Sequence, residues 1–144
     1  MPDPVLTVTD GHTRDDEALI GQALNAFNER HTGVVHSRRL AILMHQVAGG
    51  ALIGGLVGRT SLGLLFIDLV FVPEVLRGSG VGTELVRRAE TEAIVRGCTQ
   101  SVLYTIAFQA PAFYGRLGYQ VFGEVRSGPA DQARLFMTKA LGVG

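Results

Sequence analysis

Apolar and polar residues follow two different periods along this chain. Residues 13–30 repeat apolar side chains every three to four positions behind Thr13 and a set of acidic residues, which predicts a helix capped by Thr13. Residues 38–50, 51–60 and 62–72 are apolar runs interrupted by glycine, which predicts three strands, the last two joined as a hairpin. A short alternating run at 6–10 predicts an earlier strand, and 31–37 a loop.

Strands and helices alternate in the second half of the chain. Residues 82–96 place apolar side chains at helical spacing and stop before Gly97, the residue type that most often follows a helix. We also predict a strand at 100–108, a short helix at 110–117 with Pro111 in its first turn, and strands at 119–125 and 133–141. This order indicates a mixed α/β sheet, and the length fits one domain spanning 1–144.

Composition narrows the range of partners. Thirteen basic residues balance 13 acidic ones, which argues against a nucleic-acid binder that neutralises phosphates. The single cysteine, Cys98, cannot form an internal disulfide and fits a reducing compartment. No apolar run reaches the roughly 18 residues of a membrane span, and the N-terminus lacks the pattern of a signal peptide. We therefore expect a cytoplasmic protein that binds neither nucleic acid nor membrane.

Three glycines in five residues separate the strand at 62–72 from the helix that follows. They form the pattern Arg77-x-x-Gly80-x-Gly82, which brings unpaired backbone N–H donors and the positive end of a helix dipole together and so favours a pyrophosphate. No Lys-Ser/Thr follows, as a Walker A motif requires, and Thr83 stands where a dinucleotide fingerprint needs glycine. A tight turn that binds nothing remains the alternative.

Two stretches together resemble a known family. "VFVPEVLRGSGVGTELVRRAE" (70–90) looks like the acyl-CoA-binding motif of the GCN5-related N-acetyltransferase (GNAT) superfamily, and "APAFYGRLGYQVFGE" (110–124) resembles its second motif. The resemblance runs from about residue 39 to 141 and is strongest to a bacterial subgroup of unassigned substrate. It implies a mixed, largely antiparallel central sheet of about seven strands with flanking helices. It also implies transfer of an acetyl group from acetyl-CoA to an amine, by direct attack through a tetrahedral intermediate.

The resemblance assigns the cofactor contacts to positions along both motifs. The strand would pair with pantetheine, and the N–H of Val70 would polarise the thioester carbonyl. Many members carry asparagine where this chain has Ala107, so either Gln109 replaces it or the contact is lost. The implied cofactor-binding residues are Val70, Phe71, Val72, Arg77, Gly78, Ser79, Gly80, Val81, Gly82, Thr83, Gln109, Phe113 and Tyr114.

Two side chains are candidates for moving protons. Tyr114 matches the tyrosine that protonates the leaving thiolate in many members, and a phenol with a pKa of about 10 is protonated at neutral pH. The alternative is an aromatic side chain that only packs, as we expect of Tyr104 and Tyr119. Asp68 is the only charged residue in its apolar strand, so it is either the general base, directly or through water, a group that orients the amine, or a structural hydrogen-bond acceptor. His45 and Glu124 are weaker candidates for the base.

The acceptor is the least specified part. We expect a primary amine on a small molecule, no metal ion, and a homodimer because the region before residue 38 is short for a wall of the acceptor cleft. A non-catalytic acyl-CoA-binding or sensing module on the same fold is the main alternative. A dinucleotide-binding fold would instead require tight binding of NAD or FAD.

Overall fold

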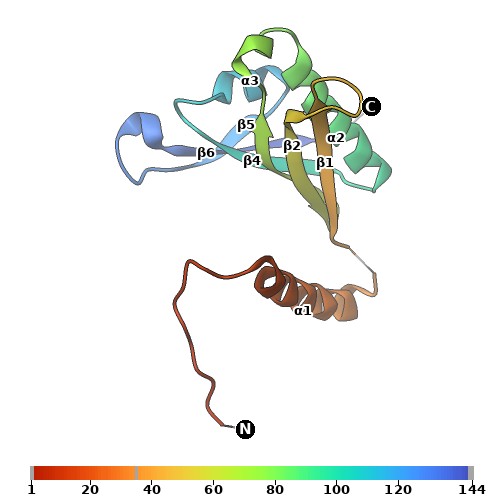
Figure 1. Cartoon of the computed structure of the whole chain (residues 1–144), viewed down its shortest axis with the longest axis vertical. Helices are drawn as coiled ribbons and strands as arrows, with labels where there is room; N and C mark the ends of the chain where they lie inside the picture. The colour runs from red at the N-terminus through yellow and green to blue at the C-terminus, as the bar shows by residue number, and fades with distance from the viewer. Residues whose placement is uncertain (1, 35, 143–144) are drawn as a thin grey trace. The chain divides into compact units, whose positions relative to one another are not determined.

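The computed structural model describes residues 2–34 and 36–142 (Figure 1). The helices are α1 (Arg14–Thr32), α2 (Val81–Val95) and α3 (Pro111–Arg116), with single 3-10 turns at Glu74–Leu76 and Ala130–Gln132. The strands are β1 (Arg38–His45), β2 (Leu52–Ser61), β3 (Leu64–Phe71), β4 (Gln100–Ile106), β5 (Gln120–Val125) and β6 (Arg134–Ala140). The chain divides into two compact units, Met1–His36 and Ser37–Gly144.

The second unit is built on one six-stranded sheet in the order β1-β2-β3-β4-β6-β5. Only the central pair, β3 and β4, is parallel, and the other pairs are antiparallel. The predicted mixed, largely antiparallel sheet with flanking helices is therefore confirmed. The expected strand at 6–10 does not form, so the sheet has six strands rather than about seven. An alternating pattern provides the faces of a strand but not a partner strand to pair with.

Helix α2 packs across β1, β2 and β3 (Figure 1). Its apolar stripe, Leu85, Val86, Ala89 and Ala93, is buried in the core, as the helical spacing predicted. On its outer face Glu84 pairs with Arg88 at 2.8 Å. Gly97, with a φ of 87°, follows the end of the helix in the left-handed conformation that glycine adopts without strain.

The sheet opens between its two central strands. The parallel pairing of β3 with β4 covers only Leu64–Phe66 and Gln100–Val102, and beyond these residues the strands diverge. On the other side of β3 the pairing with β2 skips Asp68, which is therefore the extra residue of a β-bulge. Gly58 of β2 lies opposite this bulge, where a Cβ atom would meet the Phe66 carbonyl oxygen. The bulge bends β3 at the point where the opening begins.

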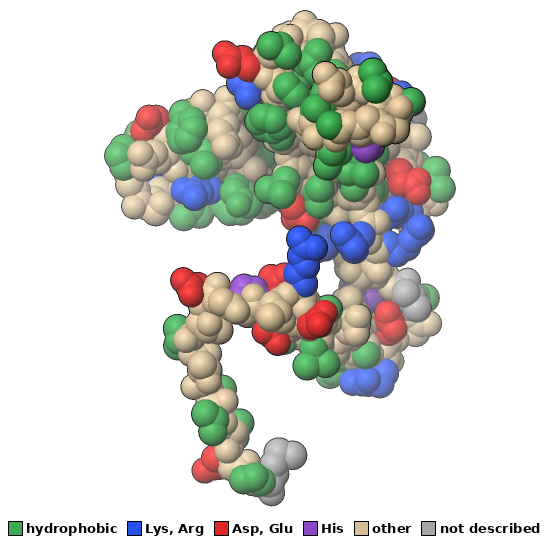
Figure 2. Space-filling view, in the orientation of Figure 1, with side chains coloured by type: hydrophobic (Ala, Val, Ile, Leu, Met, Phe, Trp, Pro, Cys, Tyr) green, Lys and Arg blue, Asp and Glu red, His purple; other side chains and the backbone are tan. Residues whose placement is uncertain are grey.

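β3 is central in the sheet without being fully covered. Its sequence is apolar on both faces, as in a central strand, and β3 does lie between β2 and β4. Leu69 and Phe71 are nevertheless 68% and 57% exposed, and Figure 2 shows hydrophobic side chains at the surface of this unit. The apolar sequence of β3 therefore fits its central position in the sheet, although some of its side chains are exposed.

The first unit contains one long helix, α1, among its described residues. Thr13 caps α1 through a capping box, because its hydroxyl accepts from the N–H of Asp16 at 3.1 Å while the Asp16 carboxylate accepts from the N–H of Thr13 at 2.8 Å. Gly33 ends the helix with a φ of 78°. The predicted cap is confirmed, and the helix runs two residues beyond its predicted end. The predicted loop at 31–37 includes residue 35, which lies outside the described residues.

Among the described residues, no helix is both long enough and apolar enough to cross a membrane.

Candidate active site

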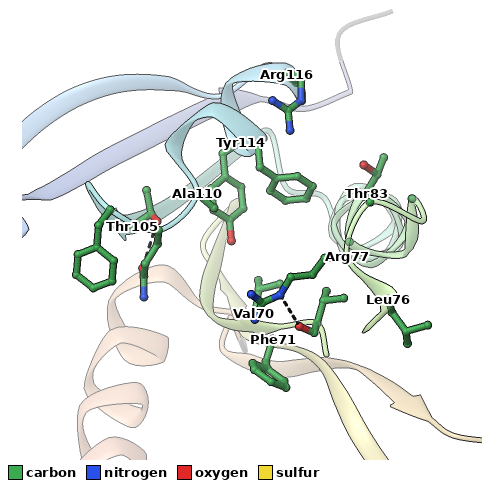
Figure 3. A pocket seen from close by; sticks show the side chains of 16 residues that line it. Val70, Phe71, Leu76, Arg77, Thr83, Thr105, Ala110, Tyr114 and Arg116 are labelled. Atoms are coloured by element: carbon green, nitrogen blue, oxygen red, sulfur yellow. Dashed lines mark hydrogen bonds between the residues drawn. The ribbon is translucent and has the colours of Figure 1, made fainter. Parts of the chain in front are cut away.

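A cleft of about 880 Å³ occupies the opening between the two central strands (Figure 3). It extends from the end of β3 along the glycine turn to the first turn of α2, and the loop after β4 and α3 form its other wall. The residues that line it are Val70, Phe71, Val72, Leu76, Arg77, Gly78, Gly80, Gly82, Thr83, Thr105, Phe108, Gln109, Ala110, Phe113, Tyr114 and Arg116.

The glycine turn presents free backbone to this cleft. Gly78 and Gly80 have φ angles of 81° and 90°, and a Cβ atom at either position would meet no heavy atom within 4 Å. Glycine is needed here because the backbone is left-handed, and the space above the turn is open. The first helical hydrogen bond of α2 runs from the N–H of Glu84 to the Gly80 carbonyl, so the N–H groups of residues 81–83 precede the helical ladder. The turn therefore has the donors and the room that a pyrophosphate requires.

Two side chains shape the turn itself. The Nε–H of Arg77 donates to the Val72 carbonyl at 3.1 Å, which ties the turn to the end of β3 and leaves the terminal guanidinium nitrogens for an anion. Ser79 uses both its N–H and its hydroxyl on the Leu76 carbonyl, so it closes the turn and does not line the cleft. Val81 is also absent from the lining residues. Of the backbone donors expected between 78 and 83, the N–H of Ser79 is therefore already used.

Tyr114 is held rigidly at the wall of the cleft. Only 8% of it is exposed, and its ring makes edge contacts with Phe113 and Tyr119 at centroid distances of 5.0 and 6.0 Å. Its hydroxyl points into the cleft toward the side formed by β3 (Figure 3). Burial raises the pKa of Tyr114 above its ordinary value, so the phenol is protonated at neutral pH. This is the state that a proton donor needs.

A buried polar network fixes the ring behind Tyr114. The Tyr119 hydroxyl donates to Glu90 at 2.9 Å and lies 2.8 Å from the Ser101 hydroxyl. Lys139 completes the network with an ion pair to Glu90 at 3.0 Å. The network connects α2, β4 and β6 to Tyr119, the residue just before β5, so Tyr119 is an anchored packing residue, as the sequence predicted.

Gln109 is oriented by the end of β4. Its side-chain oxygen accepts from the N–H of Ile106 at 3.0 Å and from the Thr105 hydroxyl at 3.3 Å. Because the oxygen is occupied, the amide NH₂ is the group that remains for a ligand. Gln109 therefore offers the cleft a hydrogen-bond donor from a fixed position.

Asp68 does not line the cleft. Its carboxylate pairs with Arg59 of the neighbouring strand at 3.2 and 3.3 Å, and both side chains are about half exposed. The Arg59 guanidinium also lies over the Phe66 ring at 4.2 Å. The carboxylate in this apolar strand is thus stabilised by an ion pair at the bulge. Glu124 pairs with Arg126, and His45 bonds to the Gly50 carbonyl.

Comparison with known proteins agrees with this geometry. Residues 37–121 match the family model of the acetyltransferase (GNAT) domain. The chain belongs to the GNAT acetyltransferases. It is 36% identical to blasticidin-S acetyltransferase of Streptomyces morookaense over 78% of this chain and 85% of that protein. It is 33% identical to acetyltransferase Atu2258 of Agrobacterium fabrum over 85% and 89% of the two chains.

Solved structures show the same fold. A crystal structure from Agrobacterium tumefaciens of a protein assigned to the acetyltransferases superposes with a TM-score of 0.82 at 30% identity, covering 96% of this chain and all of that one. An acetyltransferase from Bacillus cereus gives a TM-score of 0.71 at 26% identity, covering 94% and 98%. This GNAT protein is accordingly an N-acetyltransferase, a member of a family that uses acetyl-CoA.

The cleft of this acetyltransferase contains most of the residues singled out from the sequence. Eleven of the 13 predicted cofactor residues line it, because the end of β3, the glycine turn, Gln109 and α3 meet there.

 Tyr114, the candidate acid, is one of these eleven residues, whereas Ser79 and Val81 lie outside the lining. The structure thus brings the two motifs together into one site and leaves Asp68 outside it.

Sequence reasoning missed five lining residues, Leu76, Thr105, Phe108, Ala110 and Arg116. Thr105 and Phe108 follow from the place where β4 ends, which the sequence predicts only to within a few residues. Arg116 had an available signal, because it stands three positions after Phe113 and so shares its face of the short helix.

Among the described residues, no group of three or more His, Cys, Asp or Glu side chains is placed to hold a metal ion.

Proposed function

We propose that this protein transfers the acetyl group of acetyl-CoA to a primary amine of a small molecule. One observation carries the proposal: a single cleft joins the glycine turn of α2, the diverging end of β3 and the buried Tyr114 hydroxyl. These are an anion site, a strand edge and a proton donor, and an acyl-CoA thioester needs all three.

The fit to acetyl-CoA is supported along the cleft. The N–H groups at the start of α2 and the Arg77 guanidinium suit the pyrophosphate. The amide-rich pantetheine could pair as an added strand with Val70, Phe71 and Val72, which lie beyond the end of the β3–β4 pairing. The amide NH₂ of Gln109 could donate to one of the pantetheine carbonyls.

The chemistry assigns one task to each group. The amine nitrogen attacks the thioester carbonyl carbon and forms the carbon–nitrogen bond of a tetrahedral intermediate. This intermediate then collapses, which restores the carbonyl, breaks the carbon–sulfur bond and releases the thiolate. The N–H of Val70 would stabilise the developing oxyanion, and Tyr114 would give its proton to the departing sulfur. The amine proton would leave to a base, for which Asp68, acting through water, is our candidate, although its carboxylate pairs with Arg59 and does not line the cleft.

The acceptor class is supported by a relative. The chain shares 36% identity with a protein named for acetylating blasticidin S. A small molecule with a reactive primary amine is therefore the acceptor we propose.

Release of free CoA thiol, measured across a library of amines that includes blasticidin S, tests the proposal. Acetyl-CoA binding is first measured by calorimetry. A protein that fails to bind the cofactor is thereby distinguished from one that binds it but finds no suitable amine in the library. Thiol release that depends on one class of amine supports the enzyme. Tight binding with no release from any amine would favour the alternative, a non-catalytic acyl-CoA-binding module.

The role of Asp68 has its own test. Asp68→Asn with Arg59 retained should lower turnover at saturating acetyl-CoA if the carboxylate accepts the amine proton, and raising the pH should restore part of the rate by supplying neutral amine. Unchanged turnover at every pH would reduce Asp68 to the partner of Arg59.

A further inference from the structure

The lining of the cleft carries an uneven charge. Arg77 and Arg116 are its only charged residues among those described, so two positive charges face the cleft without a carboxylate to balance them. Arg77 already belongs to the proposed pyrophosphate site. Arg116 has no assigned task, and its guanidinium forms no ion pair with any described carboxylate.

The position of Arg116 follows from the packing of α3 on α2. Phe113 lies against Gly82 in the first turn of α2, where a Cβ atom would come within 3.3 Å of the ring. Arg116 stands one helical turn after Phe113 and therefore lies on the same face of α3. Both residues line the cleft together with Thr83 of α2, and Figure 3 labels Arg116 and Thr83.

The two guanidinium groups come from different elements. Arg77 precedes the glycine turn and is tied to the end of β3 through the Val72 carbonyl. Arg116 comes from the end of α3, the element on the other wall (Figure 3). The turn supplies backbone N–H groups of its own for a pyrophosphate, whereas the Arg116 side of the cleft offers only a side chain. A second anionic group, separate from the pyrophosphate, fits this arrangement.

We propose that Arg116 recognises the 3′-phosphate on the ribose of coenzyme A. This inference rests on the proposed binding of acetyl-CoA. The 3′-phosphate is a terminal monoester that carries close to two negative charges at neutral pH, and a guanidinium can hold it through two parallel N–H donors. The protein would thereby distinguish coenzyme A from its 3′-dephospho form.

Calorimetry with two ligands tests this assignment. Acetyl-CoA and acetyl-3′-dephospho-CoA are titrated, without an amine, into the unaltered protein and into Arg116→Gln, Arg116→Lys and Arg77→Gln. Arg116→Gln should weaken acetyl-CoA about tenfold and leave the dephospho ligand within twofold, and Arg116→Lys should restore part of the difference. Arg77→Gln should weaken both ligands alike. Arg88→Gln is the matched control, because it removes the same charge from the outer face of α2, and it should change neither.

Two results overturn the inference alone. If the unaltered protein binds acetyl-CoA and Arg116→Gln weakens the binding of both ligands equally, Arg116 acts on the pyrophosphate or through the overall positive potential of the cleft. If Arg116→Gln changes neither ligand, Arg116 contacts no phosphate. Failure of the unaltered, folded protein to bind acetyl-CoA at millimolar concentration would instead overturn the proposed function and this inference with it.

Discussion

At the scale of single residues, Tyr114 combines burial with access to the cleft. Its ring is fixed by Phe113 and by Tyr119, which is itself anchored through Glu90 and Lys139. The position of the Tyr114 hydroxyl in the cleft is thus set by the packing of its ring rather than by a hydrogen bond. Removing the oxygen alone should leave this packing intact.

Tyr114→Phe should lower turnover by about a hundredfold, the lower end of what a general acid contributes, while the dissociation constant of acetyl-CoA changes less than threefold. Calorimetry and steady-state thiol release on the same preparation check both values. Turnover equal to that of the unaltered protein would remove Tyr114 from the chemistry.

The pH dependence of turnover follows from the direction of the pKa shift. Burial raises the pKa of Tyr114 above its ordinary value of about 10, so its proton is present throughout the neutral and mildly alkaline range and is lost only as the pH rises through the higher folded value. We expect no fall in turnover assigned to Tyr114 below about pH 10. Turnover measured from pH 6 to 10.5 checks this. A fall in turnover near pH 8 that is present in the unaltered protein and absent in Tyr114→Phe would contradict it.

The residues differ in how far the sequence could predict them. Gly78, Gly80 and Tyr114 belong to local motifs whose geometry depends on neighbours in the chain. The pairing of Asp68 with Arg59 depends on the register of two strands and on the bulge between them. A one-residue change of register moves a side chain to the other face, so this partner could not be predicted from the sequence.

At the scale of elements, the bulge in β3 depends on the strand beside it. Gly58→Ala would place a Cβ atom against the Phe66 carbonyl oxygen, a backbone atom that cannot rotate away. We expect the free energy of unfolding to fall by about 1–3 kcal/mol, as for other overpacked sites, measured by urea unfolding.

Gly115→Ala provides the matched control. A Cβ atom at Gly115 of α3 meets no heavy atom within 4 Å, so this variant should be as stable as the unaltered protein or slightly more so. Equal stability of both variants would show that β2 moves aside and that the bulge does not require glycine at position 58.

At the scale of the whole molecule, the order of helices and strands from residue 38 onward was predictable. Each of these elements has a recognisable spacing of apolar residues and is followed by glycine or another residue that ends it. The strand expected at 6–10 does not form, because a strand needs a partner strand as well as an alternating sequence. That residues 1–144 act as one domain remains a prediction.

α1 has an apolar stripe, Leu19, Ile20, Leu24 and Phe27, and the described residues of Met1–His36 contain no other helix or strand to pack against it. An apolar stripe needs a covering surface, and a second copy of this chain would supply one, so we predict a homodimer. Light scattering coupled to size exclusion should give about twice the chain mass of 15.4 kDa at high concentration. A monomer mass under the same conditions would contradict it.

The short parallel contact between β3 and β4 has a consequence for amide hydrogen exchange. Only three residues of each strand pair across this seam, so backbone amides of β3 beyond Phe66 that face the opening have no strand to protect them. In the free protein these amides should exchange quickly, although they lie in the middle of a six-stranded sheet. A pantetheine arm that pairs with β3 as an added strand would slow their exchange and leave the outer strand β1 unchanged. Exchange measured by mass spectrometry with and without acetyl-CoA would then locate the seam as the place where ligand completes the sheet, and uniform protection across all strands would contradict it.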